Sequence, residues 1–219
     1  MNILALDTAT ERCSVALLLG ERLIERALET QRGHAELVLP MVESVLADGG
    51  VELRAVDAVA YGRGPGAFTG VRIAVGVAQG LAFGLNVPTI GVSNLAAVAL
   101  RFAQPGREIL VCMDARMGEV YWARFGCGDD GLVEALGEEF VSAPELVQPA
   151  SAAVFAGTGF KAYPQLAPPD TLSLHADALP HAREVARLAT RELKAGRGVR
   201  AAEAAPVYLR DQVAFPTKK

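Results

Sequence analysis

The order of apolar and polar positions in the first half of the chain predicts strands followed by helices. An apolar run from Ile3 ends at Asp7, and two more strand-like runs follow, joined by a hairpin signal at Gly20-Glu21. Residues 34–50 carry apolar side chains at helical spacing and end in glycine, and residues 55–62 are typical of a buried strand. The first half is therefore expected to fold as three strands, a helix, a strand and a helix.

The same order recurs in the second half. An apolar strand from Ile109 again ends on an aspartate, Asp114, and leads through a polar turn into two more strand-like runs. The segment Ser142-Ala-Pro-Glu145 has the pattern of a capping box and predicts the start of a helix. Residues 152–160 contain the next buried strand, so the second half repeats the first.

This repeat predicts an α/β protein with two lobes. A Pro/Gly turn at 104–108 separates the halves and gives expected lobes of residues 1–104 and 105–219. Each lobe is expected to be a β-β-β-α-β-α unit, with a cleft between the two.

Composition narrows the class of protein. Apolar residues make up 51% of the chain, which supports a packed core, and the net charge of −4 argues against a broad basic surface for nucleic acid. Asp7 interrupts the first apolar run, so no signal peptide is expected, and glycines and charges interrupt the longer runs, so no membrane span is expected. The three cysteines have no metal-binding spacing and are expected to be free thiols in the cytoplasm.

Two strand ends are candidates for binding phosphate. Asp7, with Thr8 beside it, and Asp114 each end a strand at a turn, and in a nucleotide site the two aspartates would face each other across the cleft. The alternative, which we favour, is that each carboxylate caps its own turn. Gly157 and Gly159 could let the backbone approach an adenosine, although short glycine pairs are also common in turns.

The segment from Arg63 to Gly84 is rich in glycine but fits neither common phosphate-binding motif. Gly70 is followed by Val71-Arg72 rather than by the Lys-Ser/Thr of a P-loop, and the spacing of the first glycines is one residue too long for a dinucleotide fingerprint. Thr69 is a candidate N-cap for the helix that follows, and Arg72 could help to hold an anion there.

Five segments of the chain together resemble the bacterial TsaB (YeaZ) family. They are ILALDTAT, GRGPGAFTGVRIAVGVAQGLAFG, PTIGVS, MDARMGEVYWA and PVYLRD, and they are spread over nearly the whole chain. The resemblance implies the ribonuclease H-like fold of the actin, sugar-kinase and heat-shock ATPase superfamily, in agreement with the repeat. It also implies a part in making threonylcarbamoyladenosine beside the anticodon of tRNA.

The role that the resemblance implies is that of a scaffold without catalytic activity of its own. It implies binding to a catalytic TsaD-like subunit, together with a TsaE-like ATPase, and a homodimer when the chain is alone. The chain would need no cofactor itself, ATP would be used by the complex, and tRNA would be met only through the complex.

Two departures bear on the alternative functions. TsaD-like relatives carry metal-binding histidines where this chain has Asn94 and Val98, so a metallopeptidase is disfavoured. The superfamily usually has a glycine soon after the first aspartate, whereas Thr8 and Ala9 stand here, which argues against ATP hydrolysis. A small-molecule kinase or ATPase that uses the cleft stays open as the alternative function.

The glycines in the helix after Thr69 suggest that another segment approaches its backbone closely. Gly76, Gly80 and Gly84 fall on one helical face, which contacts either a partner or the sheet of its own lobe. The apolar band of helix 34–50 is also wider than one face requires. The resemblance implies that these helices bind the partner, and the expected contact residues are Leu37, Val38, Met41, Val45, Arg72, Gly76, Gly80 and Gly84.

Overall fold

The first half of the chain forms a five-stranded sheet. The structure is a computed structural model, and it describes residues 1–149, 151–169, 171 and 173–210. The strand order is β3-β2-β1-β4-β5, with antiparallel pairs among the first three strands and parallel pairs of β1 with β4 and of β4 with β5. The strands are β1 (Asn2–Asp7), β2 (Arg12–Leu19), β3 (Arg22–Glu29), β4 (Ala58–Gly62) and β5 (Thr89–Val92).

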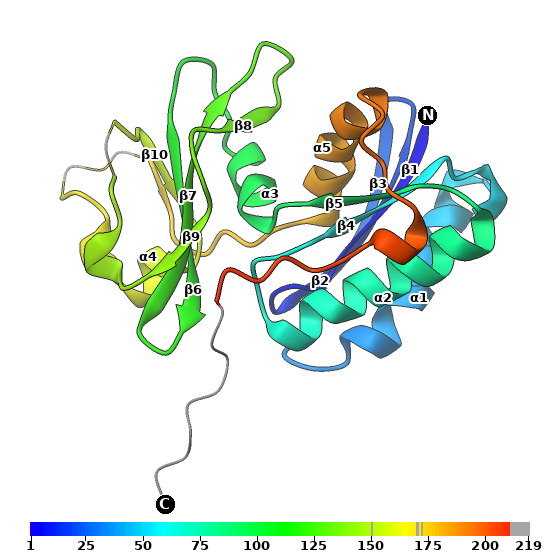
Figure 1. The fold of residues 1–219 in the computed structure, drawn as a ribbon, viewed down its shortest axis with the longest axis horizontal. Coiled ribbons are helices and arrows are strands. Elements are labelled where there is room, and N and C mark those ends of the chain that lie inside the picture. Colours follow the sequence, from blue (N-terminus) through cyan, green and yellow to red (C-terminus); the bar gives the residue numbers. More distant parts are fainter. Residues whose placement is uncertain (150, 170, 172, 211–219) are drawn as a thin grey trace, which may run out of the picture.

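The second half forms another sheet with the same topology. Read from β8, its order is β8-β7-β6-β10-β11, which again places the third, second, first, fourth and fifth strands of the path in turn, and β9 pairs with β7 beside this path. The strands are β6 (Ile109–Arg116), β7 (Glu119–Cys127), β8 (Val133–Ala135), β9 (Phe140–Ser142), β10 (Val154–Ala156) and β11 (Leu174–His175). The duplicated fold expected from the sequence is confirmed, and Figure 1 shows the two sheets apart from each other.

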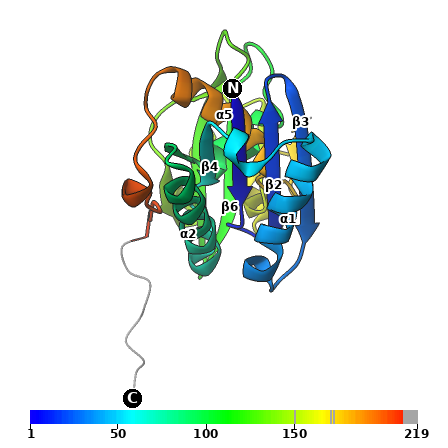
Figure 2. The same ribbon diagram turned by 90° about the vertical axis from the view of Figure 1, so that its right-hand side faces the viewer.

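Two long helices cover one face of the first sheet. Helices α1 (His34–Gly49) and α2 (Phe68–Leu85) lie side by side on it (Figure 2), with the short η1 (Leu53–Ala55) after α1. Both helices end in a left-handed residue, Gly50 and Asn86, whose N–H bonds back to carbonyl groups of the last turn. Their inward side chains pack against Leu4, Leu6 and other residues of the same face of the sheet.

The outer face of the second sheet has no counterpart to these helices among the described residues, so one sequence prediction is wrong. Ser142 ends strand β9, and only the single turn η2 (Pro144–Leu146) follows it. The Ser142 hydroxyl accepts a hydrogen bond from the Trp122 indole at 2.9 Å, so it anchors the strand instead of capping a helix. The short α4 (Gly159–Ala162) and η3 (Pro164–Leu166) stand where the second helix was expected.

Two further helices lie between the sheets (Figure 1). Helix α3 (Asn94–Leu100) contacts β6, β7 and β8 of the second sheet, and α5 (Ala182–Lys194) contacts β1, β2 and β4 of the first. One apolar core therefore runs through both halves, with Ile3 on one side and Met113 on the other. After α5, the turn η4 (Ala201–Glu203) packs on α2, and residues 204–210 cross back to the β6–β7 hairpin.

Helix α2 is unusually apolar for a helix of which one face is exposed. Among the residues that the structure describes, it is the one helix long and apolar enough to cross a membrane by length and composition, with a mean hydropathy of 1.4. A third of it is buried, through side chains such as Val71, Ala74 and Ala78 that pack on the first sheet. Other apolar residues of α2, such as Phe83, and the glycines Gly76, Gly80 and Gly84 are exposed on the opposite face.

Candidate functional site

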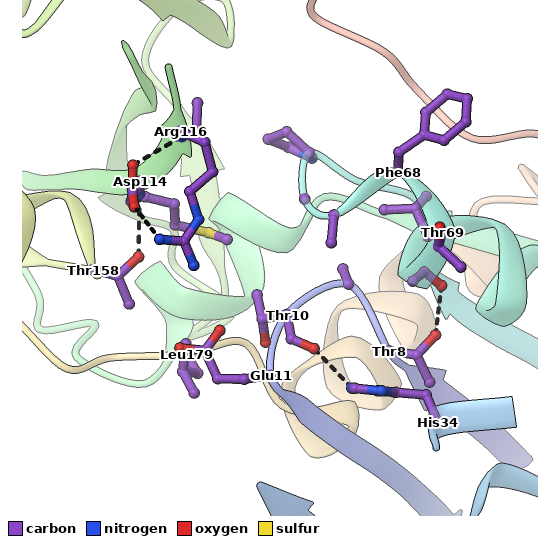
Figure 3. A pocket seen from close by; sticks show the side chains of 18 of the residues that line it. Thr8, Thr10, Glu11, His34, Phe68, Thr69, Asp114, Arg116, Thr158 and Leu179 are labelled. Atoms are coloured by element: carbon purple, nitrogen blue, oxygen red, sulfur yellow. Dashed lines mark hydrogen bonds and ion pairs between the residues drawn. The ribbon is translucent and has the colours of Figure 1, made fainter. Parts of the chain in front are cut away.

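A cleft of about 1550 Å³ lies between the two halves (Figure 3). One wall consists of the β1–β2 turn with Thr10 and Glu11, the loop that leads into α2, and the start of α1. The other wall consists of the end of β6 with Asp114 and Arg116, and of Thr158 at the start of α4. This is the position at which the sequence predicts a nucleotide site.

Asp7 does not face this cleft, contrary to the phosphate-site interpretation. Its side chain is fully buried, where one oxygen accepts a hydrogen bond from the Ala9 N–H at 3.2 Å and the other accepts one from the Asn94 amide. Burial raises the pKa of Asp7 to about 7, because charge is costly away from water. Both carboxylate oxygens are therefore already engaged inside the first half.

Asn94 connects Asp7 to the glycine-rich loop. The Asn94 side-chain oxygen accepts a hydrogen bond from the Gly64 N–H at 2.8 Å, and the Asn94 backbone N–H donates to the Gly64 carbonyl at 3.0 Å. Val98, one turn later, is buried in the core that the two halves share. The two positions at which the resemblance places metal-binding histidines in TsaD-like relatives thus carry an amide used for internal structure and an apolar core side chain.

Thr8 and the first hairpin turn are closely covered by the loop that leads into α2. The Thr8 hydroxyl donates to the Gly70 carbonyl at 2.7 Å, and the Ala67 N–H donates to the Ala9 carbonyl at 2.7 Å. A Cβ atom on Gly70 would lie 2.0 Å from the Thr8 carbonyl oxygen, so only glycine permits this approach. The first glycines of the motif thus serve backbone packing, and they leave Thr8 no free hydroxyl proton for a phosphate.

The start of α2 also differs from the prediction. The helix begins at Phe68, so its N-cap is Ala67 rather than Thr69, and no side chain caps it. The loop bonds to the β1–β2 turn through Ala67, which fixes the backbone there and sets the first helical residue just after it. Thr69 lies exposed in the first turn of the helix.

Asp114 lines the cleft but is occupied by its own turn. One oxygen accepts a hydrogen bond from the Arg116 N–H at 2.8 Å, and the other lies 3.1 Å from the Arg116 guanidinium. Figure 3 shows these contacts of Asp114. Lys161, on the same wall, pairs with Asp177 at 2.6 Å. This is the turn-capping arrangement that we favour from the sequence. The three cations on this wall, Arg116, Lys161 and Arg210, each have a carboxylate partner.

Gly157 and Gly159 do not line the cleft, so the interpretation as an adenosine cradle is not supported. A Cβ atom on Gly157 would lie 2.1 Å from the Cys112 carbonyl oxygen, and one on Gly159 would lie 2.9 Å from the Cys112 Cβ. The two glycines allow α4 to pack directly against strand β6. Thr158 between them does reach the cleft, where its hydroxyl accepts a hydrogen bond from the Asp114 N–H at 3.1 Å.

The outer face of α2 is the second candidate site. Gly76, Gly80 and Gly84 are exposed there, and a Cβ atom on any of them would meet no atom within 4 Å. They therefore do not pack against the sheet of their own half, which was one of the two interpretations of the glycine spacing. Phe83 lies on the same face and is 80% exposed, and Arg72 lies one turn before Gly76.

The predicted contact residues of α1 divide into two groups. Val38 and Val45 are fully buried against the first sheet, so their assignment to a partner surface is corrected. Leu37 and Met41 are half-buried and pack at the edge of the same core. The width of the apolar band predicts more partner-facing residues than the fold leaves free, because the central side chains of the band hold α1 on the sheet.

Several exposed apolar side chains near this face were missed at the level of sequence. Leu39 of α1 is 48% exposed, and Phe68, Phe83 and Tyr208 are exposed on or against α2. Phe83 could have been found, because a residue three after Gly80 and seven after Gly76 must share their face. Tyr208 could not, because the contact between residue 208 and α2 is made only by the fold.

Comparison with known proteins finds relatives that match nearly the whole chain. Residues 26–216 match the family model described as TsaD, tRNA N6-adenosine threonylcarbamoyltransferase. The tRNA threonylcarbamoyladenosine biosynthesis protein TsaB of Escherichia coli K12 is 42% identical, over 98% of this chain and 97% of that protein. The TsaB protein of Haemophilus influenzae is 40% identical, over 98% of this chain and 96% of its own length.

A solved structure agrees with the fold. YeaZ from Pseudomonas aeruginosa is 46% identical and superposes with a TM-score of 0.87, covering 95% of this chain and 99% of that one. Another crystal structure from the same organism, described as similar to the peptidase YeaZ, gives a TM-score of 0.89 at the same identity and coverage. With the duplicated fold, these relationships show that the chain belongs to the TsaB (YeaZ) family of tRNA threonylcarbamoyladenosine biosynthesis proteins.

Proposed function

We propose that this chain is a non-catalytic scaffold subunit in the threonylcarbamoylation of adenosine next to the anticodon of tRNA. In this proposal it binds a TsaD-like catalytic subunit through the outer face of α2 and the neighbouring edge of α1. The observation that carries the proposal is the exposed row of Gly76, Gly80 and Gly84 with Phe83 beside it.

The cost of this row supports a role in binding. Each glycine inside an exposed helix costs about 1 kcal/mol relative to alanine. Nothing within the described residues needs these three positions to lack a side chain, because all three face open space. A smooth helical face does allow the backbone of a second helix to approach closely, and the exposed Phe83 and Leu39 supply apolar area for such a contact.

The other members of the proposed assembly follow from the same role. A TsaE-like ATPase would join the complex, ATP would be used by the complex, and this chain would need no cofactor and meet tRNA only through its partners. We propose that the assembly works in the cytoplasm. When the TsaD-like subunit is absent, a second copy of this chain would cover the same apolar face and give a homodimer.

The cleft supports the alternative function, a small-molecule kinase or ATPase, less well. It is large enough for a nucleotide, but Asp7 is buried away from it and the Thr8 hydroxyl donates to Gly70. Arg116 and Lys161, which could hold a phosphate, are paired with Asp114 and Asp177. A phosphate would have to displace these pairs before it could bind to either of these two side chains.

Reconstitution of the modification tests the proposal. Unmodified tRNA and ATP are mixed with the TsaD-like and TsaE-like proteins and an extract of cells that lack this chain, with and without the purified chain. We expect modification to require this chain, to survive Asp114→Asn and to fail with Gly80→Leu. Loss of modification with Asp114→Asn in a complex that still assembles would instead favour a catalytic cleft.

A further inference from the structure

Arg72 is held rigidly at one end of the glycine row. It lies four residues before Gly76 and therefore on the same face of α2. Its guanidinium carbon lies 3.4 Å from the centre of the Phe68 ring, and its Nε donates to the Tyr208 hydroxyl at 2.8 Å. The cation–π contact with the Phe68 ring and the hydrogen bond to the Tyr208 hydroxyl together fix the plane of the guanidinium.

The C-terminal segment that brings Tyr208 to Arg72 is itself anchored at several points. The Gln79 amide of α2 donates to the Ala204 carbonyl at 2.8 Å, and the Val207 N–H donates to the Arg63 carbonyl at 2.7 Å. Further along, Arg210 donates to the Ala115 carbonyl at 3.1 Å. Tyr208 is thus a fixed partner, and it orders Arg72 before any other protein arrives.

The terminal nitrogens of this ordered arginine point to a ligand of a definite kind. Within residues 1–149, 151–169, 171 and 173–210, neither an ion pair nor a hydrogen bond involves Nη1 or Nη2 of Arg72. A planar guanidinium with its Nε engaged still offers a fork of N–H groups that matches the two oxygens of a carboxylate. Because its plane is already fixed, little side-chain entropy would be lost on binding.

We propose that Arg72 binds a carboxylate side chain of the TsaD-like subunit and so fixes how that subunit sits along α2. This inference rests on the proposed function, because it takes the outer face of α2 as the docking surface. A protein carboxylate fits this site better than an RNA phosphate. The guanidinium lies against the rings of Phe68 and Tyr208, and the chain carries a net charge of −4, which disfavours a surface that binds RNA phosphates.

The test compares four variants with the wild type by calorimetric titration into the purified TsaD-like subunit. Arg72→Gln removes the charged fork, and Arg72→Lys keeps the charge without the bidentate geometry. Tyr208→Phe removes only the hydroxyl that orients Arg72, and Arg187→Gln is the control, since Arg187 is exposed on α5 at the opposite face of the first sheet. Thermal unfolding of each variant shows that the fold is intact.

We expect Arg72→Gln to raise the dissociation constant by about tenfold or more and to weaken its dependence on salt. Arg72→Lys should bind less well than the wild type, Tyr208→Phe should show a smaller loss, and Arg187→Gln should bind normally. Full recovery with Arg72→Lys would overturn the forked contact. If Arg72→Gln left binding of the subunit unchanged but weakened binding of tRNA by the complex, the ligand would be a phosphate and the inference would be wrong.

Comparing Gly80→Leu with Arg72→Gln separates the docking face of α2 from the specific role of Arg72. If Gly80→Leu abolished binding while Arg72→Gln bound like the wild type, the docking face would stand and the role of Arg72 would be wrong. If both variants bound like the wild type, the docking face itself would be contradicted.

Discussion

At the scale of single residues, Asp7 is a carboxyl group that the fold uses in its interior. Its oxygens accept hydrogen bonds from the Ala9 N–H and from Asn94, and Asn94 in turn holds Gly64. An aspartate at the end of the first strand is visible in the sequence, but its burial is not, because Gly62 and Asn94, which lie against its carboxylate, are distant in the sequence. The structure therefore assigns to packing a residue that the motif alone would place in a nucleotide site.

The buried Asp7 predicts a specific dependence of stability on pH. Burial raises its pKa in the folded protein from 3.8 to about 7, so the folded chain holds a proton that the unfolded chain has lost. The stability that this group contributes is complete below pH 3.8 and is lost as the pH rises through 7. Its slope is at most about 1.4 kcal/mol per pH unit.

Urea unfolding between pH 5 and pH 8 measures this effect. The wild type should lose stability relative to Asp7→Asn over this range, because the variant has no proton to release at that position. Parallel stability curves for the two proteins would show that Asp7 is ionised throughout and would contradict the assignment.

At the scale of the element, α2 combines two kinds of glycine that the sequence does not separate. Gly70 touches the backbone of the first hairpin turn, whereas Gly76, Gly80 and Gly84 face open space. Helical spacing predicts that the last three share a face, but which face is outward depends on how α2 packs on the sheet. For the same reason, Val38 and Val45 were wrongly assigned to the partner surface: the sequence shows that they belong to the apolar band of α1, but not that this part of the band faces the sheet.

The two kinds of glycine should respond oppositely to alanine. Gly80→Ala should stabilise the isolated chain by up to about 1 kcal/mol, since it adds helix propensity in open space. Gly70→Ala should destabilise it by about 1 to 3 kcal/mol, because the new methyl group would collide with the Thr8 carbonyl and the backbone must shift. Chemical denaturation of both variants measures the two effects, and a loss of similar size at both positions would contradict the open face.

At the scale of the whole molecule, the sequence predicts part of each sheet but not which helices cover its faces. The repeated apolar runs around Asp7 and Asp114 predict three antiparallel strands and a parallel strand after them, whereas the edge strands β5 and β11 were not predicted. The second half then departs from the repeat, because Ser142 bonds to Trp122 where a helix cap was expected. Helix α3 follows the first sheet in the chain but packs on the second, and α5 follows the second sheet but packs on the first. The spacing of apolar residues does not predict this, because it depends on contacts between the halves.

The shared core predicts that the two halves unfold together. The single tryptophan, Trp122, lies in the second sheet, whereas helices α1, α2 and α5 pack on the first. Tryptophan fluorescence and far-ultraviolet circular dichroism should therefore give coincident urea transitions. A fluorescence midpoint clearly below the circular dichroism midpoint would mean that the halves are separately stable, and the core between them would then contribute little.

The central claim is that the outer face of α2 is a docking surface and not merely an exposed one. The most direct test is the dissociation constant for the TsaD-like subunit, measured for the wild type, Gly80→Leu and Arg187→Leu, together with the melting temperature of each. At concentrations at which the chain is monomeric, Gly80→Leu should keep or slightly raise its melting temperature, because the added side chain meets open space in the monomer and leucine has a higher helix propensity than glycine. It should nevertheless bind at least about tenfold more weakly, because that side chain would lie between closely packed helices. Arg187→Leu, on the far side of the first sheet, should bind like the wild type, and equal affinity of all three proteins for the subunit would contradict the claim.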